Sequence, residues 1–329
     1  MSGPPKKKRR YSILTRRDKI VLLIIVGIPV VLDIVFIWGP TVASILFSFT
    51  NWQGYGGITA QNVVGLQNYT FLFTQYTLFW PALSHNLLWL AFFVFIASPI
   101  GIFFAVLLDR EIRGSRFYQN IFYFPVVLSL AVVGIIWELQ YAPDGFIDSA
   151  LGLTKQTNAI DWLGNPSLNI WAVLVAASWR HVGYIMVLYL AGLKSVDPTL
   201  REAAAIDGAS DIQTFFRVIF PVMAPINVVI VVVTVIESLR AFDLVYIINQ
   251  GTNGLELLSI LITNNSISEA SLVGRGSAIA VILLVISLVP ITLYLTRVMR
   301  STGELPRTRW PGDRTSGASA RVGWPFTPS

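Results

Sequence analysis

The stretch DPTLREAAAIDGASDIQTFFRVIFP, residues 197–221, is a polar island between two long apolar segments. Asp197-Pro198 is typical of a helix start, because the aspartate side chain caps the helix and proline fits the first turn, where no N–H is needed. Gly208 predicts the end of that helix, since glycine enters the left-handed conformation without steric cost. A second short helix is expected from about Asp211. We call this predicted rigid helix–Gly–helix unit the 197–221 loop.

The composition of the 329-residue chain excludes several classes of protein. Apolar residues make up 54% and charged residues 13%, which indicates a membrane protein and not a soluble one. The sequence has no cysteine and two histidines, so thiolate chemistry and histidine-rich metal sites are excluded. It contains no G-x-x-x-x-G-K-[ST] phosphate loop, no H-E-x-x-H and no nucleophile elbow. We therefore expect neither an enzyme nor a bound cofactor, and any ATP must bind to a partner.

Six apolar segments are long enough to cross a bilayer, which takes about 20 helical residues. They are expected at residues 20–49, 86–108, 121–141, 170–193, 221–248 and 277–299. Long continuous apolar runs favour helices over a β-barrel, so the predicted fold is an all-α integral membrane protein with six transmembrane helices. Pro29 and Pro40 are expected to bend the first segment. A cleaved signal peptide is the alternative for that segment, but its apolar run is about twice the usual length.

The basic residues predict which side of the membrane each loop faces. Of the 24 lysines and arginines, 20 lie in the N-terminal tail, in the loops after the second and fourth segments, and at the C-terminal end. Short loops rich in these residues stay in the cytoplasm, so both termini and the 197–221 loop are expected there. The predicted organisation is a basic tail (1–19), a six-span membrane domain (20–300) and a disordered cytoplasmic tail (301–329). Because the positive charge is explained by topology, no nucleic acid partner is expected.

Polar side chains within the fourth and fifth spans are candidates for a substrate path, because ionisable groups at membrane depth are costly unless paired or hydrated. The candidates are Arg180, Glu237, Arg240, Phe242, Asp243, Tyr246 and Asn249. Residues three apart on a helix are neighbours, so Glu237, Arg240 and Asp243 are expected to form one ribbon facing an outward-opening wet cavity. An ion-pair network that locks the two spans together and a proton relay are the alternatives. Amides, carboxylates and aromatic faces of this kind bind sugars, and the helix is expected to break into a polar loop at Asn249.

Several stretches resemble one family of transport proteins. The run REAAAIDG at 201–208, followed by Ile-Phe-Pro at 219–221, resembles the "EAA" loop of inner-membrane permeases of binding-protein-dependent ABC importers. GLQNY (65–69), residues 86–116, AFDLVY (241–246) and GRGSA (274–278) are similar to the sugar-type subfamily that includes the maltose and glycerol-3-phosphate permease subunits. The resemblance covers residues 20–300. NQGT at 249–252 departs from the Thr-Gly-Gly-Gly-Pro-like turn of that subfamily.

The resemblance implies a transmembrane subunit that works with a second homologous permease, two ABC ATPases that bind ATP and Mg, and an extracytoplasmic solute-binding protein. The implied substrate is a sugar or related polyol. Carried over to this sequence, the ATPase-coupling residues are Glu202, Ala203, Ala204, Asp207 and Gly208. An ion-coupled secondary transporter is the alternative, for which an internal repeat with paired broken helices is expected. From the residues alone, an ordinary amphipathic surface loop stays open as the alternative for residues 197–221.

Overall fold

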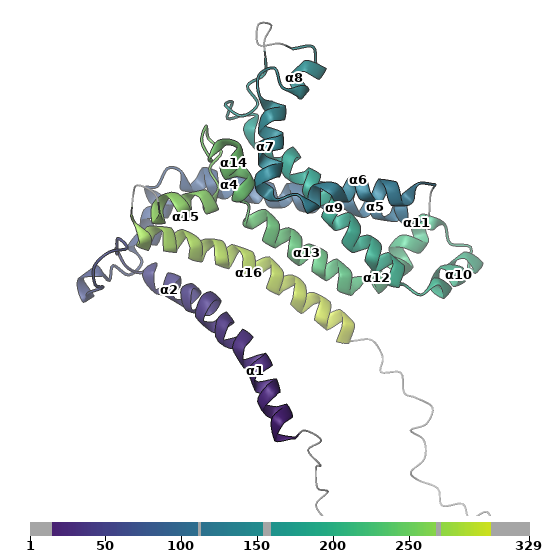
Figure 1. The fold of residues 1–329 in the computed structure, drawn as a ribbon, viewed down its shortest axis with the longest axis horizontal. Coiled ribbons are helices and arrows are strands. Elements are labelled where there is room, and N and C mark those ends of the chain that lie inside the picture. The colour runs from purple at the N-terminus through teal and green to yellow at the C-terminus, as the bar shows by residue number, and fades with distance from the viewer. Residues whose placement is uncertain (1–14, 111–112, 154–158, 268–270, 304–329) are drawn as a thin grey trace, which may run out of the picture.

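The computed structural model describes residues 15–110, 113–153, 159–267 and 271–303, and these form an elongated helical bundle (Figure 1). Over these residues there is no β-strand, and a single isolated bridge joins Thr50 to Val63. The bounds of the α-helices are α1 Arg16–Asp33, α2 Gly39–Phe47, α3 Gln67–Thr74, α4 Phe79–Phe92, α5 Ser98–Asp109, α6 Ser115–Val127, α7 Leu130–Tyr141, α8 Phe146–Ala150, α9 Asn169–Ser195, α10 Pro198–Ile206, α11 Asp211–Thr214, α12 Phe220–Val222, α13 Ala224–Leu239, α14 Asp243–Asn249, α15 Leu258–Ser266 and α16 Val273–Gly303.

Four helical segments are long and apolar enough to cross a membrane without a sharp bend. They are Arg17–Phe47, Phe79–Asp109, Asn169–Ser195 and Val273–Thr296, and they match the first, second, fourth and sixth predicted spans. The other two predicted spans are bent pairs of helices. Ser115–Val127 and Leu130–Tyr141 meet at 101°, and Asp211–Val222 and Ala224–Asn249 meet at 80°. The all-helical class is confirmed, with four to six spans according to how the bent pairs are counted.

The third predicted span, over 121–141, contains a sharp bend that the sequence analysis did not predict. Leu128 and Ser129 adopt extended backbone conformations, and the Ser129 hydroxyl then accepts a hydrogen bond from the Val132 N–H at 3.3 Å, which starts α7 as a new helix. In Figure 1, α7 and α8 stand out from the bundle at the top. Apolar content alone does not reveal such a break, because apolar residues lie on both sides of it.

Three prolines are each preceded by a short π-helical turn. The turns are Ile34–Trp38, Phe93–Ala97 and Phe215–Ile219, and the second residue after each is Pro40, Pro99 or Pro221. The residue between each turn and its proline donates its N–H to the carbonyl of the residue five positions earlier, as Gly39 does to the Ile34 carbonyl. Proline lacks an N–H and crowds the carbonyl four residues before it, so a wider turn removes the conflict. In the first segment the irregularity thus precedes Pro40, whereas Pro29 lies inside regular α1.

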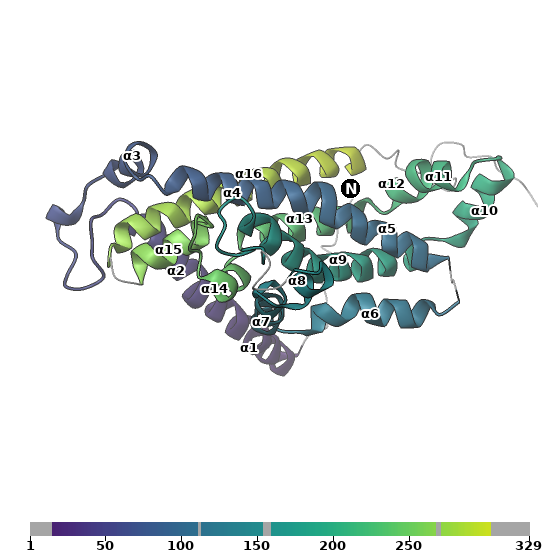
Figure 2. The same ribbon diagram turned by 90° about the horizontal axis from the view of Figure 1, so that it is seen from above.

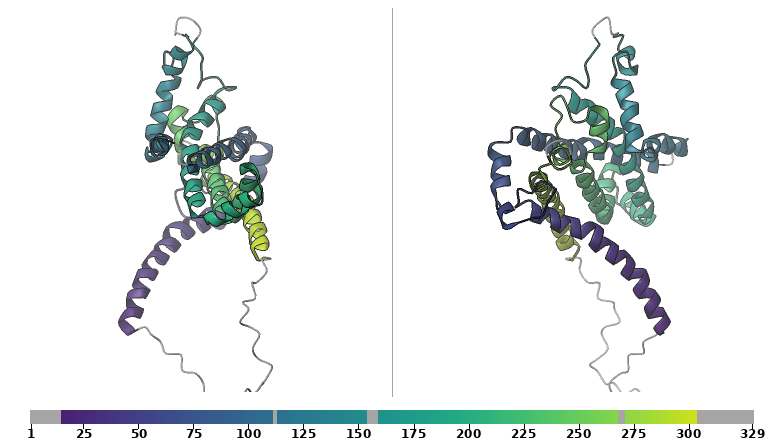
Figure 3. Two further views of the ribbon diagram at one scale, coloured as in Figure 1. Left: turned by 90° about the vertical axis from the view of Figure 1, so that its right-hand side faces the viewer. Right: turned by 60° about the vertical axis from the view of Figure 1, so that its left-hand side comes forward.

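The centre of the bundle is α9, and α1 lies at its edge. In α9, 61% of the most apolar 18-residue stretch is buried inside the protein, whereas 0% of the most apolar 18-residue stretch of the first segment is buried. Figures 1 and 3 show α1 leaving the bundle while α2 stays beside α16. Gly183 lets α9 and α6 touch, since a β-carbon there would lie 2.1 Å from the Phe122 carbonyl oxygen. The 197–221 loop lies at one end of the bundle and α3 at the other (Figure 2).

Candidate functional site

The 197–221 loop has the predicted helix–Gly–helix structure. The Asp197 carboxylate accepts a hydrogen bond from the Thr199 N–H at 2.9 Å, and this bond holds the pKa of Asp197 below its ordinary value. At the other end of α10, Gly208 has φ +76°, and the N–H groups of Gly208 and Ala209 donate to the carbonyls of Ala205 and Ala204. This pair of bonds is a Schellman cap. Both ends of α10 are therefore closed by local hydrogen bonds.

The second helix of the loop is capped as well. The Ser210 hydroxyl accepts from the Gln213 N–H at 3.3 Å, and the Gln213 side chain accepts from the Ser210 N–H at 3.0 Å. Such a reciprocal capping box satisfies two backbone donors that a helix start would otherwise leave unpaired. Because these bonds fix Ser210, the N-cap of the short α11, the turn at Gly208 is held by caps on both sides.

The residues predicted to couple to an ATPase do not all face outward. Glu202, Ala203, Asp207 and Gly208 are exposed, and so is Ile206, with 86% of its surface accessible. Ala204 is buried, at 7% exposure, so it packs against the rest of the chain. The three consecutive alanines Ala203 to Ala205 are thus divided between two faces of α10. Exposed Ile206, which the sequence did not single out, adds an apolar side chain to the outer face.

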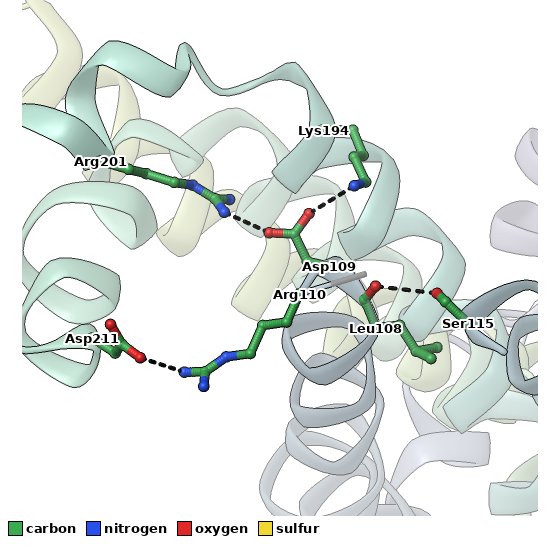
Figure 4. Close-up of polar contacts among 7 residues, drawn as sticks. All are labelled: Leu108, Asp109, Arg110, Ser115, Lys194, Arg201 and Asp211. Carbon is green, nitrogen blue, oxygen red and sulfur yellow. Dashed lines mark hydrogen bonds and ion pairs between the residues drawn. The ribbon is translucent and has the colours of Figure 1, made fainter. Parts of the chain in front are cut away.

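An ion-pair cluster joins the loop to the bundle (Figure 4). Arg201 on α10 contacts Asp109 at 2.7 Å, and Lys194 at the end of α9 lies 3.5 Å from the same carboxylate. Next to them, Arg110 contacts Asp211 at 2.9 Å. The Asp109 side chain is 8% exposed, whereas the Arg110 and Asp211 side chains are 58% and 80% exposed. Asp109 is therefore the partly desolvated centre of the cluster.

The charged residues of the fourth and fifth segments surround one cavity of about 290 Å³. Its wall includes Arg180, Glu237, Arg240, Phe242 and Asp243, all of them predicted from the sequence. The remaining lining residues are Trp89, Phe93, Leu130, Val133, Ala177, His181, Ala241 and Leu244. The cavity thus combines charges of both signs with aromatic rings.

The helix that carries these charges breaks inside the wall, which corrects the predicted ribbon. α13 ends at Leu239 and α14 begins at Asp243, so Glu237, Arg240 and Asp243 do not follow one another on a single helix. The Ala241 carbonyl exposed by the break accepts a hydrogen bond from the Ser259 hydroxyl at 2.6 Å. Broken helices in membrane proteins are tolerated where protein covers the freed backbone.

The ion pair in the cavity also differs from the one that helix spacing suggested. Glu237 lies 3.7 Å from Arg180 of α9, and over the described residues Arg240 forms no ion pair. Arg240 is the C-terminal cap of α13, where the helix has already ended. The observed pair joins the fourth and fifth segments, as the alternative of a locking network requires. It leaves Arg240 and Asp243 as charges in the wall.

Tyr246 and Asn249 lie outside the lining of this cavity. The Tyr246 ring stacks on Phe242 with centroids 5.1 Å apart, so it supports a lining residue. The Asn249 carboxamide accepts from the Gly251 N–H at 3.0 Å, and α14 ends there, as predicted. Asn249 therefore shapes the polar turn that follows α14.

Buried His181 is a cavity residue that the predicted site did not include. Its Nε2 lies 3.1 Å from the Ser98 hydroxyl and 3.5 Å from that of Thr234, and its ring stacks on Phe93 with centroids 4.2 Å apart. Ser98 and Thr234 are themselves 3.0 Å apart. The cluster links α5, α9 and α13. A histidine beside Arg180 in an apolar segment was the available sequence signal, but its partners are far away in the chain.

A second, polar cavity of about 580 Å³ lies at the opposite end of the bundle from the 197–221 loop, between Trp52, Phe71 and Arg275. The Arg275 guanidinium lies 4.0 Å from the centre of the Phe71 ring. None of the residues predicted for the substrate path line this cavity.

A capped loop at one end and a charged cavity at a broken helix fit a transport subunit, and comparisons with known proteins agree. The chain belongs to the family described as "Binding-protein-dependent transport system inner membrane component", whose model matches residues 97–300. It is therefore a multi-pass membrane permease of the ABC importer class.

Three related permease proteins align with most of the chain. A xylose/arabinose import permease protein of Haloferax volcanii is 34% identical over 82% of this chain and 85% of its own length. A Synechocystis permease protein for the uptake of osmoprotective compounds is 31% identical over 81% of this chain and 94% of its own length. A diacetylchitobiose uptake permease protein of Streptomyces coelicolor is 29% identical over 98% and 94%.

The fold matches that of a solved importer. A subunit of a bacterial ABC transporter for the acidic polysaccharide alginate aligns with a TM-score of 0.72, over 87% of this chain and 97% of that chain. At 20% sequence identity, this likeness establishes the fold.

Proposed function

We propose that this chain is the permease subunit of an ATP-driven importer that carries a sugar or a related polyol across the bacterial cell membrane. The observation that supports it most directly is α10. Both its ends are capped, and its outer face presents Glu202, Ile206 and Asp207 to the outside of the chain. An exposed carboxylate beside apolar surface suits a water-excluding protein interface, where it can pair with an arginine.

The energy for transport enters through partners. The sequence lacks a phosphate loop, so ATP and Mg bind to two separate ATPase subunits. Glu202, Ala203, Asp207 and Gly208 contact an ATPase, while Ala204 faces inward and fixes α10 on the bundle. A second homologous permease completes the path, and a solute-binding protein delivers the substrate. In support, a second alginate transporter structure of this fold is described as a complex with a substrate-bound periplasmic protein.

The distribution of lysine and arginine gives this assembly its orientation. It supports cytoplasmic termini and a cytoplasmic 197–221 loop, where the ATPases are. The cavity at the break between α13 and α14 then lies on the path through the membrane. Binding sites at broken helices recur among membrane transporters, because unpaired backbone groups and helix ends meet there.

A sugar-like substrate is favoured by the cavity and by the relatives. Trp89 and Phe242 offer ring faces, and the charged side chains of Arg180, Glu237 and Asp243 can accept or donate hydrogen bonds to hydroxyl groups. Named relatives import xylose, arabinose and diacetylchitobiose. Uptake of labelled pentoses, hexoses, disaccharides and polyols by a deletion strain, with and without this gene, tests the assignment. If deletion reduces the uptake of none of these sugars and polyols, the assignment is wrong.

The comparisons do not favour an ion-coupled secondary transporter. Collapsing the ion gradients with an ionophore in vesicles that still contain ATP separates the two mechanisms. Continued uptake is expected for the importer, and uptake that follows the gradient in the absence of ATP would identify the alternative.

A further inference from the structure

The carboxylate of Asp109 is the junction of three helices. Asp109 is the last residue of α5, and its Oδ2 accepts from Nη1 of Arg201 on α10 at 2.7 Å. Its Oδ1 lies 3.5 Å from Nζ of Lys194, in the last turn of α9. Figure 4 shows both cations turned toward this one carboxylate. With 8% of its side chain exposed, Asp109 has little water to replace these partners.

The neighbouring ion pair provides an internal comparison. Arg110 and Asp211 also join α5 to the 197–221 loop, at 2.9 Å, but both side chains are largely exposed. Exposed ion pairs contribute little, because water and salt screen them. Two ion pairs therefore join α5 to the 197–221 loop. Because Asp109 is far less exposed than Arg110 and Asp211, we expect the pair with Arg201 to hold the loop more strongly.

The other end of α5 reaches the cavity. Ser98 is the first residue of α5, and its hydroxyl lies 3.1 Å from His181 in the cavity wall and 3.0 Å from Thr234 on α13. From Ser98 to Asp109 the helix is about 16 Å long, at 1.5 Å per residue. Over this length α5 packs on α9 through buried Ala105 and Leu108. α5 is thus a continuous helix with one end on the loop and the other at the cavity.

We propose that Asp109 is a positioning residue that ties the 197–221 loop to α5, so that movement of the loop shifts α5 and reaches the cavity through Ser98. The inference rests on the proposed function, in which an ATPase moves the loop. The outward face of α10 receives the partner, and Arg201 on its other side transfers the displacement to Asp109. Without the carboxylate, Arg201 loses its anion at the junction, and α10 loses its ion pair with α5.

The tether itself is testable in the purified chain. In Asp109→Asn the backbone amides of α10 are expected to exchange with deuterium about tenfold faster than in the wild type, since local opening becomes easier. Arg110→Gln removes the exposed pair and is expected to change the exchange of α10 by less than about twofold. Equal protection of α10 in Asp109→Asn and wild type would overturn the tether.

Transmission is tested in the assembled importer in membrane vesicles. Asp109→Asn is expected to lower sugar uptake about tenfold while ATP hydrolysis stays within about twofold of wild type. Asp109→Glu restores the carboxylate and is expected to recover part of the uptake, and Arg110→Gln is expected to behave like wild type. A parallel fall of uptake, hydrolysis and membrane level in Asp109→Asn would show a purely structural role and overturn the proposal.

Failure of the proposed function gives a different result. If the wild-type chain shows no ATP-dependent uptake in any assembly, the importer assignment fails, and with it the transmission of movement. The exchange experiment needs no partner and still decides whether Asp109 holds the loop.

Discussion

Gly208 provides the sharpest test of the 197–221 loop, because its surroundings separate a structural effect from a functional one. Its φ of +76° is in the left-handed region, where other residues cost about 1–2 kcal/mol. Nothing lies within 4 Å of the position that a β-carbon would occupy. The β-carbon of a substituted residue therefore meets no atom of this chain, and the main expected penalty is the backbone cost, which a protein stable by about 5–15 kcal/mol tolerates.

The expected result for Gly208→Trp is normal insertion with loss of transport. Because we propose that an ATPase docks in the open space beside Gly208, a tryptophan there is expected to lower uptake at least about tenfold, equivalent to about 1.4 kcal/mol of lost interface energy. Hydrolysis of ATP is expected to become uncoupled from uptake. Membrane level by immunoblot, uptake of labelled sugar and ATPase activity in vesicles are measured together.

Gly56 is the matched control. It has φ +73° and, like Gly208, nothing within 4 Å of its β-carbon position. It lies between α2 and α3, away from α10 (Figure 2). Gly56→Trp carries the same backbone cost and is expected to transport normally. Normal uptake by Gly208→Trp would refute the docking argument. Equal losses in the two variants would trace the effect to backbone strain alone.

Three further outcomes are expected. Arg180→Glu puts a second carboxylate opposite Glu237 and should abolish uptake, whereas the swap Arg180→Glu with Glu237→Arg should recover part of it; no recovery would exclude a functional pair. In this cysteine-free chain, Ser210→Cys should resist a membrane-impermeant maleimide in intact cells while Gln61→Cys reacts, and the reverse pattern would invert the topology. Gly183→Leu forces α9 from α6 and should remove the protein from the membrane fraction; wild-type levels would contradict that close contact.

The parts of the fold that depend on local chemistry were predictable. Asp197 and Gly208 mark the ends of α10 because a cap needs only neighbouring residues, and the structure confirms both. The apolar segments were equally visible, since each needs only enough consecutive apolar residues. The family followed from the same loop, which combines a fixed motif with fixed spacing.

The parts that depend on distant residues were not predictable. Glu237 was expected near Arg240 by helix spacing, but α13 ends before that spacing applies and Arg180, 57 positions earlier in the chain, takes the contact. His181 similarly owes its place in the cavity to Ser98 and Thr234 on other helices. Periodicity describes one helix at a time, whereas a cavity is formed by several.

The inward face of α10 shows the same limit. Ala203 and Ala204 were both expected to contact a partner, yet Ala204 is buried while Ala203 is exposed. Which side of a short helix faces the bundle is decided by contacts such as Arg201 with Asp109, and these join segments more than 90 residues apart.

We propose that ATP hydrolysis on partner subunits drives sugar transport through this chain. The most direct measurement is uptake of a labelled sugar into proteoliposomes that contain this permease, the second permease and the ATPases, with the solute-binding protein on one side and ATP on the other. Uptake is expected to require all four components and ATP, and Gly208→Trp is expected to abolish it. Sugar uptake by this chain alone, driven by an ion gradient without ATP, would show that the chain is not an ATP-driven permease.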